Sequence, residues 1–297
     1  MKIALPKSDL LEGLQAVQNV VSIRTTLPIL SNVLLQAEKG KLTLTTTDLD
    51  VSIQCTIDAK VGKGGATTLP ARRLSNIVRE LAASDIEIEV DDKDTAQVQC
   101  GSSFFKIMGL SEEEFPPIAK AEGKFCYTLD QGVFREMLRK TAYAASTDET
   151  RFVLNGRRLA LVEHEVEFPA EAEVDMILPS KVATELMHTL DESGELRIYT
   201  KENRVMFEFG SVVVSSKLIE GTYPNYRQVI PSQCEERIAV EREGLLTALK
   251  RVSLVTTEKA TATHLTFGKN QLVVSMTTPD VGEARETLPV KYTGKEL

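Results

Sequence analysis

Apolar residues recur at helical spacing in two segments of the chain that have nearly the same sequence. The segments are LPARRLSNIVREL at 69–81 and LPSKVATELMHTL at 178–190, and each begins with Leu-Pro. Proline is tolerated at the first position of a helix, because its missing N–H would have no partner within the helix there. Both segments are therefore predicted to be helices, and their similarity indicates an internal duplication.

The duplication continues past these helices. Each helix is followed by three predicted strands and then by a turn that combines an aromatic residue with proline. The strands read IEIEV, AQVQC and FFKIMGL in the first copy and LRIYT, RVMFEFG and VVVSSKL in the second. Pro70 and Pro116 are 46 positions apart, and Pro179 and Pro224 are 45 apart, so the two copies have nearly the same length from the helix to the turn.

A second type of helical segment precedes each copy and occurs a third time. Segments 8–21, 130–145 and 242–255 place apolar residues at i, i+3, i+4 and i+7 behind a polar start. Extended segments follow each of them, and KGK at 39–41 and GKN at 268–270 are predicted to turn hairpins. The repeating unit is thus helix, strands, helix, strands, about 110 to 120 residues long, which is an ordinary domain size.

This repeat predicts three domains. They are an N-terminal domain at 1–119, a central domain at 125–232 and a partial C-terminal domain at 236–297. The distance from the first helix to the Leu-Pro helix is 61 residues in the first copy, from Asp9 to Pro70, but 47 in the second, from Gly132 to Pro179. The central domain is therefore 14 residues short, near 155–158, where a strand, a turn and a strand are expected.

The third copy contains one predicted helix and its strands. The chain stops at Leu297, where the Leu-Pro helix of this copy is expected to begin. Without a second helix over the sheet, we expect the strands with sequences LTF at 265–267 and LVV at 272–274 and the strand that ends at Val290 to be partly uncovered.

Composition narrows the class of protein. With 42% hydrophobic and 26% charged residues, the chain can bury sizeable cores. Its cysteines are far apart and lack CxxC spacing, so we expect buried free thiols in a reducing compartment. They are Cys55, Cys100, Cys126 and Cys234. No segment is long and apolar enough to span a membrane, and no signal-peptide pattern opens the chain, so a soluble, cytoplasmic protein is expected.

Residue patterns give little support to catalytic chemistry. The three histidines lie in separate segments without HxxxH or HExxH spacing, which argues against a zinc site. They are His164, His188 and His264. GKGGAT at 62–67 lacks the spacing of a phosphate-binding loop. Asp48 and Asp50 could together bind Mg²⁺, but a solvated pair of carboxylates is the favoured interpretation. We therefore expect no active site, no metal and no cofactor.

Charge is concentrated on the predicted helices. The formal net charge of −8 argues by itself against tight binding of nucleic acid. The helices are nevertheless locally basic, and repeated units arranged around an axis would place these faces on one concave surface. The basic residues are Arg72, Arg73 and Arg79, then Arg135, Arg139 and Lys140, then Lys181, and finally Lys250 and Arg251.

Several motifs together resemble one protein family. They are SIRTTLPILSNVLLQ at 22–36, ATTLPARRL at 66–74, TRFVLNG at 150–156, RRLAL at 157–161, KLIEGTYPNYRQVIP at 217–231 and TTEK at 256–259. In this order they are similar to the bacterial DNA polymerase III β subunits, the sliding clamps. The resemblance implies an α+β fold of three similar domains, each with two helices backed by antiparallel sheets. By the same resemblance, the chain lacks an internal segment after Asn155 and the C-terminal half-domain.

The resemblance also implies a function and a set of sites. Two subunits of the family join head to tail in a ring around duplex DNA, with the helices lining the hole, and the ring is a non-catalytic processivity factor. Residues that match positions near the DNA are Arg24, Arg72, Arg73, Arg79, Arg151 and Lys181. Such residues would contact phosphates and would not read bases.

Two further surfaces are implied in the same way. A pocket that binds short peptides of polymerases, loader subunits and repair proteins corresponds to Leu154, Arg158, Leu159, Pro224, Gln228 and Val229. The subunit interface corresponds to Phe105, Lys106, Leu254, Val255, Glu283 and Glu286. The expected partners are therefore double-stranded DNA, a second copy of the chain, the polymerase catalytic subunit, the clamp loader and repair proteins, without a membrane.

Two other classes of protein compete with this interpretation. A nuclease or polymerase would need clustered carboxylates for two metal ions, and the only dense acids are Asp48, Asp50, Asp91 and Asp92. A repeat scaffold that binds proteins without enclosing DNA would not need basic helix faces.

Overall fold

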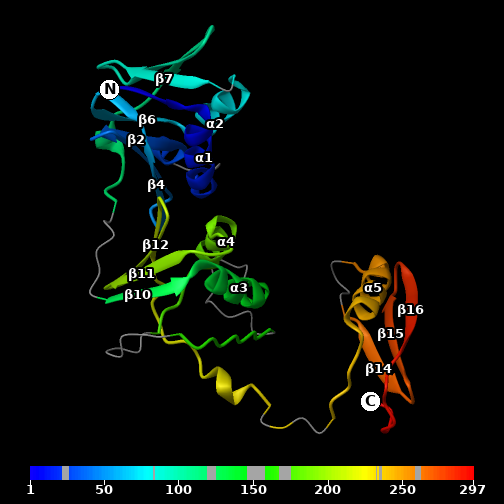
Figure 1. Cartoon of the computed structure of the whole chain (residues 1–297). Coiled ribbons are helices and arrows are strands. Elements are labelled where there is room, and N and C mark those ends of the chain that lie inside the picture. The colour runs from blue at the N-terminus through cyan, green and yellow to red at the C-terminus, as the bar shows by residue number, and fades with distance from the viewer. Residues whose placement is uncertain are drawn as a thin grey trace. The chain divides into compact units, whose positions relative to one another are not determined.

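The computed structural model of the chain is shown in Figure 1. It describes residues 1–21, 27–82, 84–118, 125–145, 158–166, 175–231, 233, 236–257 and 262–297, and for Phe125 and Cys126 it describes the backbone alone. The chain divides into two compact units, Met1–Pro224 and Asn225–Leu297, which are considered separately below as unit 1 and unit 2. No helix in the described ranges is long and apolar enough to cross a membrane.

Unit 1 begins with a complete helix, strands, helix, strands repeat, which we call the first repeat. Its helices are α1 (Lys7–Val17) and α2 (Ala71–Glu80), and short 3-10 turns occur at Gln18–Val20, Pro28–Ser31 and Glu112–Glu114. Its strands are β1 (Lys2–Pro6), β2 (Asn32–Glu38), β3 (Lys41–Thr47), β4 (Val51–Asp58), β5 (Lys60–Lys63), β6 (Gly65–Pro70), β7 (Asp85–Val90), β8 (Thr95–Cys100) and β9 (Ser103–Met108). Both predicted helices and the predicted hairpin at 39–41 are confirmed.

The second repeat of unit 1 is simpler. It contains β10 (Phe125–Asp130), α3 (Gln131–Thr141), a 3-10 turn at Ala142–Ala144, α4 (Ser180–Thr189), β11 (Glu195–Lys201), β12 (Arg204–Phe209) and β13 (Val212–Lys217). Five strands, β2 to β6, lie between the two helices of the first repeat. Between α3 and α4, by contrast, the described residues 158–166 and 175–179 form no strand.

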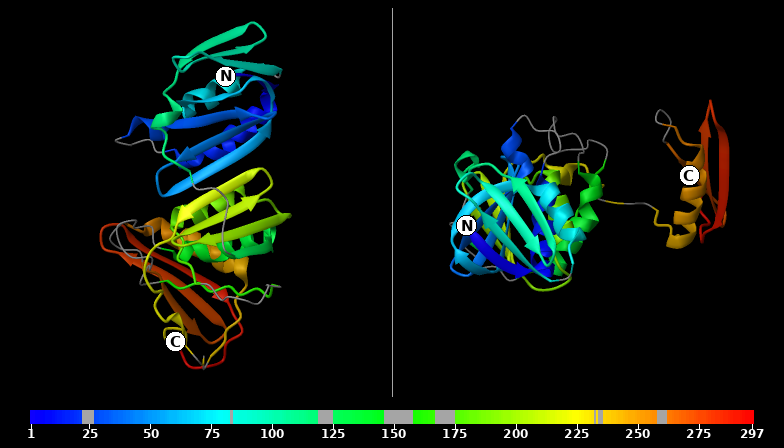
Figure 2. Two further views of the ribbon diagram at one scale, coloured as in Figure 1. Left: turned by 90° about the vertical axis from the view of Figure 1, so that its left-hand side faces the viewer. Right: turned by 90° about the horizontal axis from the view of Figure 1, so that it is seen from above.

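Two antiparallel sheets organise unit 1. The smaller has the order β5-β1-β7-β8-β9, and the larger has the order β10-β11-β12-β13-β4-β3-β2-β6. The larger sheet combines strands of both repeats, because β13 pairs with β4 from Val212 opposite Cys55 to Ser216 opposite Val51. Helices α1 and α2 contact each other, and so do α3 and α4. The joined sheet is visible from two directions in Figures 1 and 2.

The sequence pattern explains how these elements pack. In β7, the sequence DIEIEV alternates strictly, so Ile86, Ile88 and Val90 are buried while the acidic residues between them are exposed. Helix α1 lies so close to β3 and β4 that a Cβ atom added at Gly13 would be 2.8 Å from Cδ1 of Leu44. Most of the buried apolar residues of both repeats form one contiguous cluster, and Ile29, Leu30, Leu34 and Phe115 form a smaller one. Cys55 and Cys100 are buried free thiols, as predicted, and burial raises the pKa of Cys55.

Unit 2 is a single helix on a three-stranded sheet. Its elements are a 3-10 turn at Tyr226–Gln228, α5 (Arg242–Val252), a 3-10 turn at Ser253–Val255, β14 (His264–Gly268), β15 (Gln271–Thr278) and β16 (Gly282–Pro289). The sheet has the order β14-β15-β16. Its core combines Ala248 and Val252 of α5 with Leu272, Val274 and Met276 of β15.

The prediction that the third sheet would be partly uncovered is wrong for the LVV segment of β15 and for Val290, but it is confirmed for β14 and β16, in which no residue is buried. Leu272 and Val274 are 0% exposed, and Val273 and Val290 are each 7% exposed. Helix α5 covers one face, and the residues after β16 return to the sheet, where Tyr292 packs edge-on against Phe267 with ring centroids 6.3 Å apart. Leu265 of β14 is the most exposed large hydrophobic residue of these two strands, because 45% of it remains exposed.

Candidate nucleic-acid interface

The arginines of α2 form the most accessible part of the predicted DNA surface. Arg72, Arg73 and Arg79 are all exposed, and their guanidinium groups form no ion pair within the described part of the chain. Arg72 and Arg73 stand in the first turn of α2 and line a hollow of about 480 Å³. The positive end of the helix dipole adds to their charge, so this site favours an anion such as a phosphate group. Arg24 and Arg151 lie outside the described residues.

Lys181 differs from the arginines of α2. It stands in the first turn of α4, and its Nζ is 2.5 Å from Oδ2 of Asp48 in the turn between β3 and β4. Asp50 of the same turn is paired with Lys217 at 2.8 Å. The two aspartates considered as metal ligands therefore connect the first repeat to the second. Across the described residues, no group of three or more His, Cys, Asp or Glu side chains is arranged to hold a metal ion.

The basic faces expected on α3 and α5 are neutralised in part, by Glu136 on α3 and by Glu286 beside α5. Arg139 donates from Nε and Nη2 to Glu136 at 2.6 and 2.7 Å, and this hydrogen bonding lowers the pKa of Glu136 to about 2. Arg135 donates from Nε to the carbonyl of Met187 at 3.1 Å and so ties α3 to α4. Arg251 forms a two-point ion pair with Glu286, which lowers the pKa of that carboxyl. The sequence thus overstates the free positive charge of these helices.

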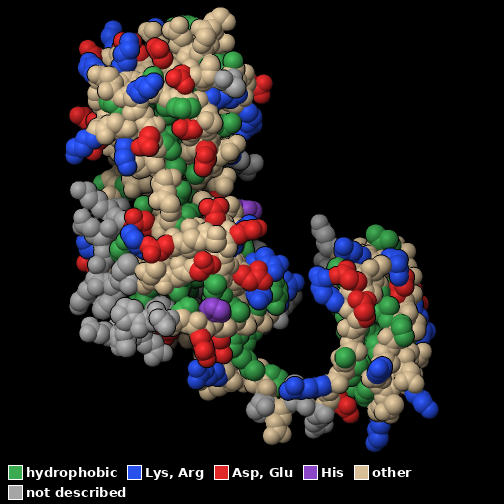
Figure 3. Space-filling model, in the orientation of Figure 1, with side chains coloured by type: hydrophobic (Ala, Val, Ile, Leu, Met, Phe, Trp, Pro, Cys, Tyr) green, Lys and Arg blue, Asp and Glu red, His purple; other side chains and the backbone are tan. Residues whose placement is uncertain are grey.

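Charges of both signs are interspersed on the surface. Figure 3 shows one face of the protein, on which Lys and Arg side chains alternate with Asp and Glu side chains over both units. Such a surface carries no broad basic field on this face.

The residues of the predicted peptide pocket are divided between the units. Arg158 and Leu159 belong to an extended segment of unit 1 (158–166), where Arg158 donates from Nη1 to the carbonyl of Tyr143 at 3.4 Å. Pro224 is exposed at the end of unit 1, and Gln228 and Val229 are exposed in unit 2, with Val229 69% exposed. Leu154 lies outside the described residues. The pocket stays a prediction.

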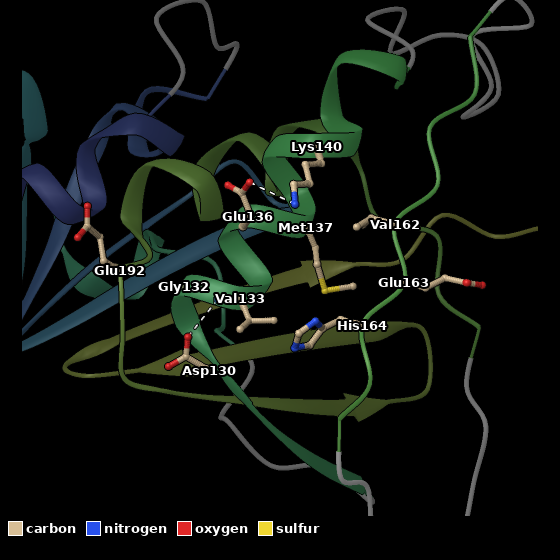
Figure 4. A pocket seen from close by; sticks show the side chains of 10 residues that line it. All are labelled: Asp130, Gly132, Val133, Glu136, Met137, Lys140, Val162, Glu163, His164 and Glu192. Atoms are coloured by element: carbon tan, nitrogen blue, oxygen red, sulfur yellow. Dashed lines mark hydrogen bonds and ion pairs between the residues drawn. The ribbon is translucent and has the colours of Figure 1, made fainter. Parts of the chain in front are cut away.

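The extended segment creates a hollow beside α3 that sequence reasoning missed. Its volume is about 430 Å³. Figure 4 shows Val133 and Met137 of α3 facing Val162 and His164 of the segment. Of the acids at its rim, Asp130 caps α3 by accepting from the backbone N–H of Val133 at 3.0 Å. No motif could have shown this hollow, because it depends on how 158–166 packs against the helix.

The residues of the predicted subunit interface lie on two edge strands and one helix end. Strand β9 is the last strand of its sheet, and it exposes Phe105 (38%) together with Lys106. Two further apolar residues of β9 are even more exposed, Phe104 at 58% and Met108 at 81%. The prediction missed these two, although FFKIM on a last strand is a readable signal. An unpaired strand edge with exposed apolar side chains favours association with another strand.

Unit 2 provides the other predicted residues of this interface. Leu254 is 81% exposed just after α5, whereas Val255 is half-buried. Glu283 is exposed on β16, which is the last strand of its own sheet. Glu286 of the same strand is paired with Arg251 within the chain.

Comparison with known proteins identifies the family. Models of the DNA polymerase III beta subunit match in order, the N-terminal domain at residues 1–119, the central domain at 156–225 and the C-terminal domain at 227–297. Beta sliding clamps of Synechocystis sp. and Haemophilus influenzae are each 32% identical to the chain, over 336 and 318 residues. The first alignment covers 99% of this chain and the second 100%, and each covers 86% of the relative.

A solved structure agrees with these relatives. The DNA polymerase III subunit beta of Bartonella birtlesii, a sliding clamp solved bound to griselimycin, superposes with a TM-score of 0.95 at 32% identity. The superposition covers 100% of this chain and 86% of that one. On the strength of the ordered family matches, the relatives and this superposition, the chain belongs to the beta sliding clamp family, the beta subunits of DNA polymerase III.

Proposed function

We infer that this chain acts as a DNA sliding clamp, a non-catalytic subunit that serves DNA polymerase III. The observation that carries this function is the match to all three beta-subunit domain models in their natural order along the chain. A clamp works with DNA, with the polymerase and with further copies of itself. Neither the scaffold that ignores DNA nor the metal-dependent enzyme is favoured by these matches.

The finer assignments are proposals. The domains are placed at 1–119, 125–232 and 236–297. Two copies join head to tail into a ring in the cytoplasm, the β9 edge of one copy meeting the β16 edge and Leu254 of the other. Support comes from the exposed apolar side chains on β9 and at the end of α5. The clamp loader and repair proteins that carry clamp-binding peptides are the further partners, at the pocket that includes Arg158, Leu159 and Val229.

Weak phosphate contacts suit such a ring. A protein that encloses DNA stays bound through its closed shape, so it needs only sequence-independent contacts with the backbone, and these permit sliding. Arg72 and Arg73 fit this role because they are exposed and unpaired at a helix N-terminus. The overall charge of −8 is compatible with it, because only the lining has to attract DNA.

The function is tested by retention on DNA of different topology. The chain is loaded by a clamp loader onto a nicked circular plasmid, and gel filtration then separates DNA-bound from free protein. A clamp should remain on the circle and leave when a restriction enzyme linearises it. Equal retention on circular and linear DNA would contradict enclosure, and degradation of the plasmid would indicate the enzyme instead.

The predicted phosphate contacts are tested by salt dependence. Each of Arg72→Ala and Arg73→Ala should lower the slope of log affinity for a labelled duplex against log salt by about 0.9. Lys60→Ala is the matched control, because it removes an exposed cation on β5 that has no proposed role. A change of sequence preference in the α2 variants would show that bases are read and would contradict the assignment.

A further inference from the structure

The turn between β3 and β4 connects the two repeats of unit 1 through its acidic side chains. The Asp48 carboxylate accepts hydrogen bonds from the backbone N–H groups of Asp50 at 3.0 Å and Val51 at 2.8 Å, both through Oδ1. Its other oxygen, Oδ2, is 2.5 Å from Nζ of Lys181. The side chains of Asp48 and Lys181 are 19% and 33% exposed, so the pair is largely sheltered from water.

The local structure fixes the carboxylate more firmly than the lysine. Two backbone N–H groups hold Asp48 in one orientation, whereas the Lys181 side chain has four rotatable bonds and, within the described ranges, Asp48 as its one ionic partner. Lys181 also stands in the first turn of α4, where the positive end of the helix dipole disfavours a cation. Both effects favour a lysine that bends toward Asp48.

A phosphate that approaches Lys181 therefore meets a pair with no net charge. Counterion release on DNA binding depends on the number of phosphates that free cations neutralise. An ammonium group already bound to a sheltered carboxylate adds little to that number, unlike Arg72, which forms no ion pair with any residue that the structure describes. The position expected to touch DNA through a lysine is thus weakened by an acid that lies 133 residues earlier in the chain.

We propose that Asp48 is a positioning residue that holds Lys181 away from the DNA backbone and so weakens the contact between α4 and the DNA phosphates. This proposal rests on the proposed function, because it assigns α4 to the DNA-facing side. The Asp48 carboxylate and the DNA phosphates compete for the ammonium group of Lys181. The consequence is a smaller contribution of α4 than of α2 to the salt dependence of binding.

The same turn offers a matched control. Asp50 pairs with Lys217 at 2.8 Å, but their side chains are 68% and 43% exposed, and Lys217 has no assigned contact with DNA. Asp48→Asn and Asp50→Asn remove the same charge from neighbouring positions. Asparagine at 48 retains the Oδ1 acceptor for the two backbone N–H groups, so the turn can keep its hydrogen bonds.

The experiment measures the affinity of a fluorescent duplex by anisotropy between 50 and 200 mM salt. Lys181→Ala should leave the slope of log affinity against log salt unchanged, because the lysine is already occupied. Asp48→Asn should steepen the slope by about 0.9, which means about 3.5-fold more loss of affinity over this range. Combining Asp48→Asn with Lys181→Ala should restore the original slope, and Asp50→Asn should not steepen it.

Two results would overturn the proposal while the clamp function stands. One is a Lys181→Ala slope that falls as much as the Arg72→Ala slope, and the other is an equal effect of Asp48→Asn and Asp50→Asn. Loss of DNA retention on circles together with unaffected slopes for the α2 variants would instead refute the proposed function.

A readout without substitutions is acylation of the unmodified protein followed by mass spectrometry. Lys181 should react more slowly than Lys217, and equal rates would also overturn the proposal.

Discussion

Leu254 is the side chain that tests the proposed ring with the least disturbance of the fold. It is 81% exposed in the single chain, whereas Val252, two residues earlier, is 1% exposed in the core of unit 2. Replacing Leu254 by alanine therefore removes little internal packing. Any loss that follows must come from a contact that the single chain does not contain.

The magnitude follows from burial and symmetry. Complete burial of a leucine side chain contributes about 1.5 to 3 kcal/mol. Most of the Leu254 surface is available for such burial, because the fold leaves 81% of it exposed. A head-to-tail ring of two subunits contains two equivalent interfaces, so Leu254→Ala should weaken the dimer by about 3 to 6 kcal/mol. This corresponds to an increase of the dissociation constant by about two to four powers of ten.

Sedimentation velocity over a range of concentrations measures this constant. The matched control is Leu265→Ala, which shortens a leucine that is 45% exposed on β14, the strand at the opposite edge of the sheet from β16. We expect the control to dimerise normally and both variants to keep their circular dichroism spectra. The reasoning is refuted if Leu254→Ala dimerises as tightly as the unmodified chain.

Three further predictions concern the fold, the pH dependence and the other half of the interface. Gly132→Ala should lower the free energy of unfolding by about 1 to 3 kcal/mol, because its Cβ would lie 2.0 Å from the carbonyl oxygen of Glu192, and this clash outweighs the gain of about 1 kcal/mol in helix propensity. Gly244→Ala in α5 should destabilise less, because its Cβ would lie 2.9 Å from Oε2 of Glu241 and 3.8 Å from Cδ2 of Leu288, both side-chain atoms, and urea unfolding compares the two variants. Backbone hydrogen bonds at the start of α5 hold the pKa of Glu241 below its usual value. The ionised carboxylate should therefore stabilise the fold fully above the unfolded-state pKa, and this stabilisation should be lost as the pH falls through the folded-state pKa. Glu241→Gln should therefore lose less stability than the unmodified chain in acid titrations followed by circular dichroism, and an identical acid profile would contradict this. Phe105→Ser on the edge strand β9 should raise the dimer dissociation constant at least tenfold, because the 38% of Phe105 that is exposed in the single chain would be buried in the interface. A normal dimer in sedimentation would count against the β9 interface.

The sequence was sufficient to predict the helices because their signals are local. Apolar spacing and the Leu-Pro start placed α2 and α4 within two residues of their observed ends. The alternation in β7 likewise shows which face of the strand is buried. A repeat with a shortened central copy was also readable, because the first helix and the Leu-Pro helix are 61 residues apart in the first copy, from Asp9 to Pro70, but 47 apart in the second, from Gly132 to Pro179.

Features that depend on distant residues could not be predicted. The pairing of β13 with β4 and the ion pair between Lys181 and Asp48 join segments that are more than 100 positions apart. Nothing in the order of the residues indicates which strand edge or which carboxylate will be the neighbour. The packing of Tyr292, which follows β16, against Phe267 of β14 was missed for the same reason. The pair of Arg139 with Glu136, in contrast, is an i, i+3 contact on one helix and could have been read from the sequence.

The joined sheet of unit 1 makes each of the two repeats depend on the other for its folding. Because β13 continues the sheet at β4, and because most of the buried apolar residues of both repeats form one cluster, neither copy has a complete boundary of its own. Cutting the chain between the two copies would leave β4 with Ile53 and β13 with Val214 as unpaired edge strands, and such edges promote aggregation. The two copies should therefore unfold together in one cooperative transition. The repeat is still visible in the sequence, but each copy is no longer an independent folding unit.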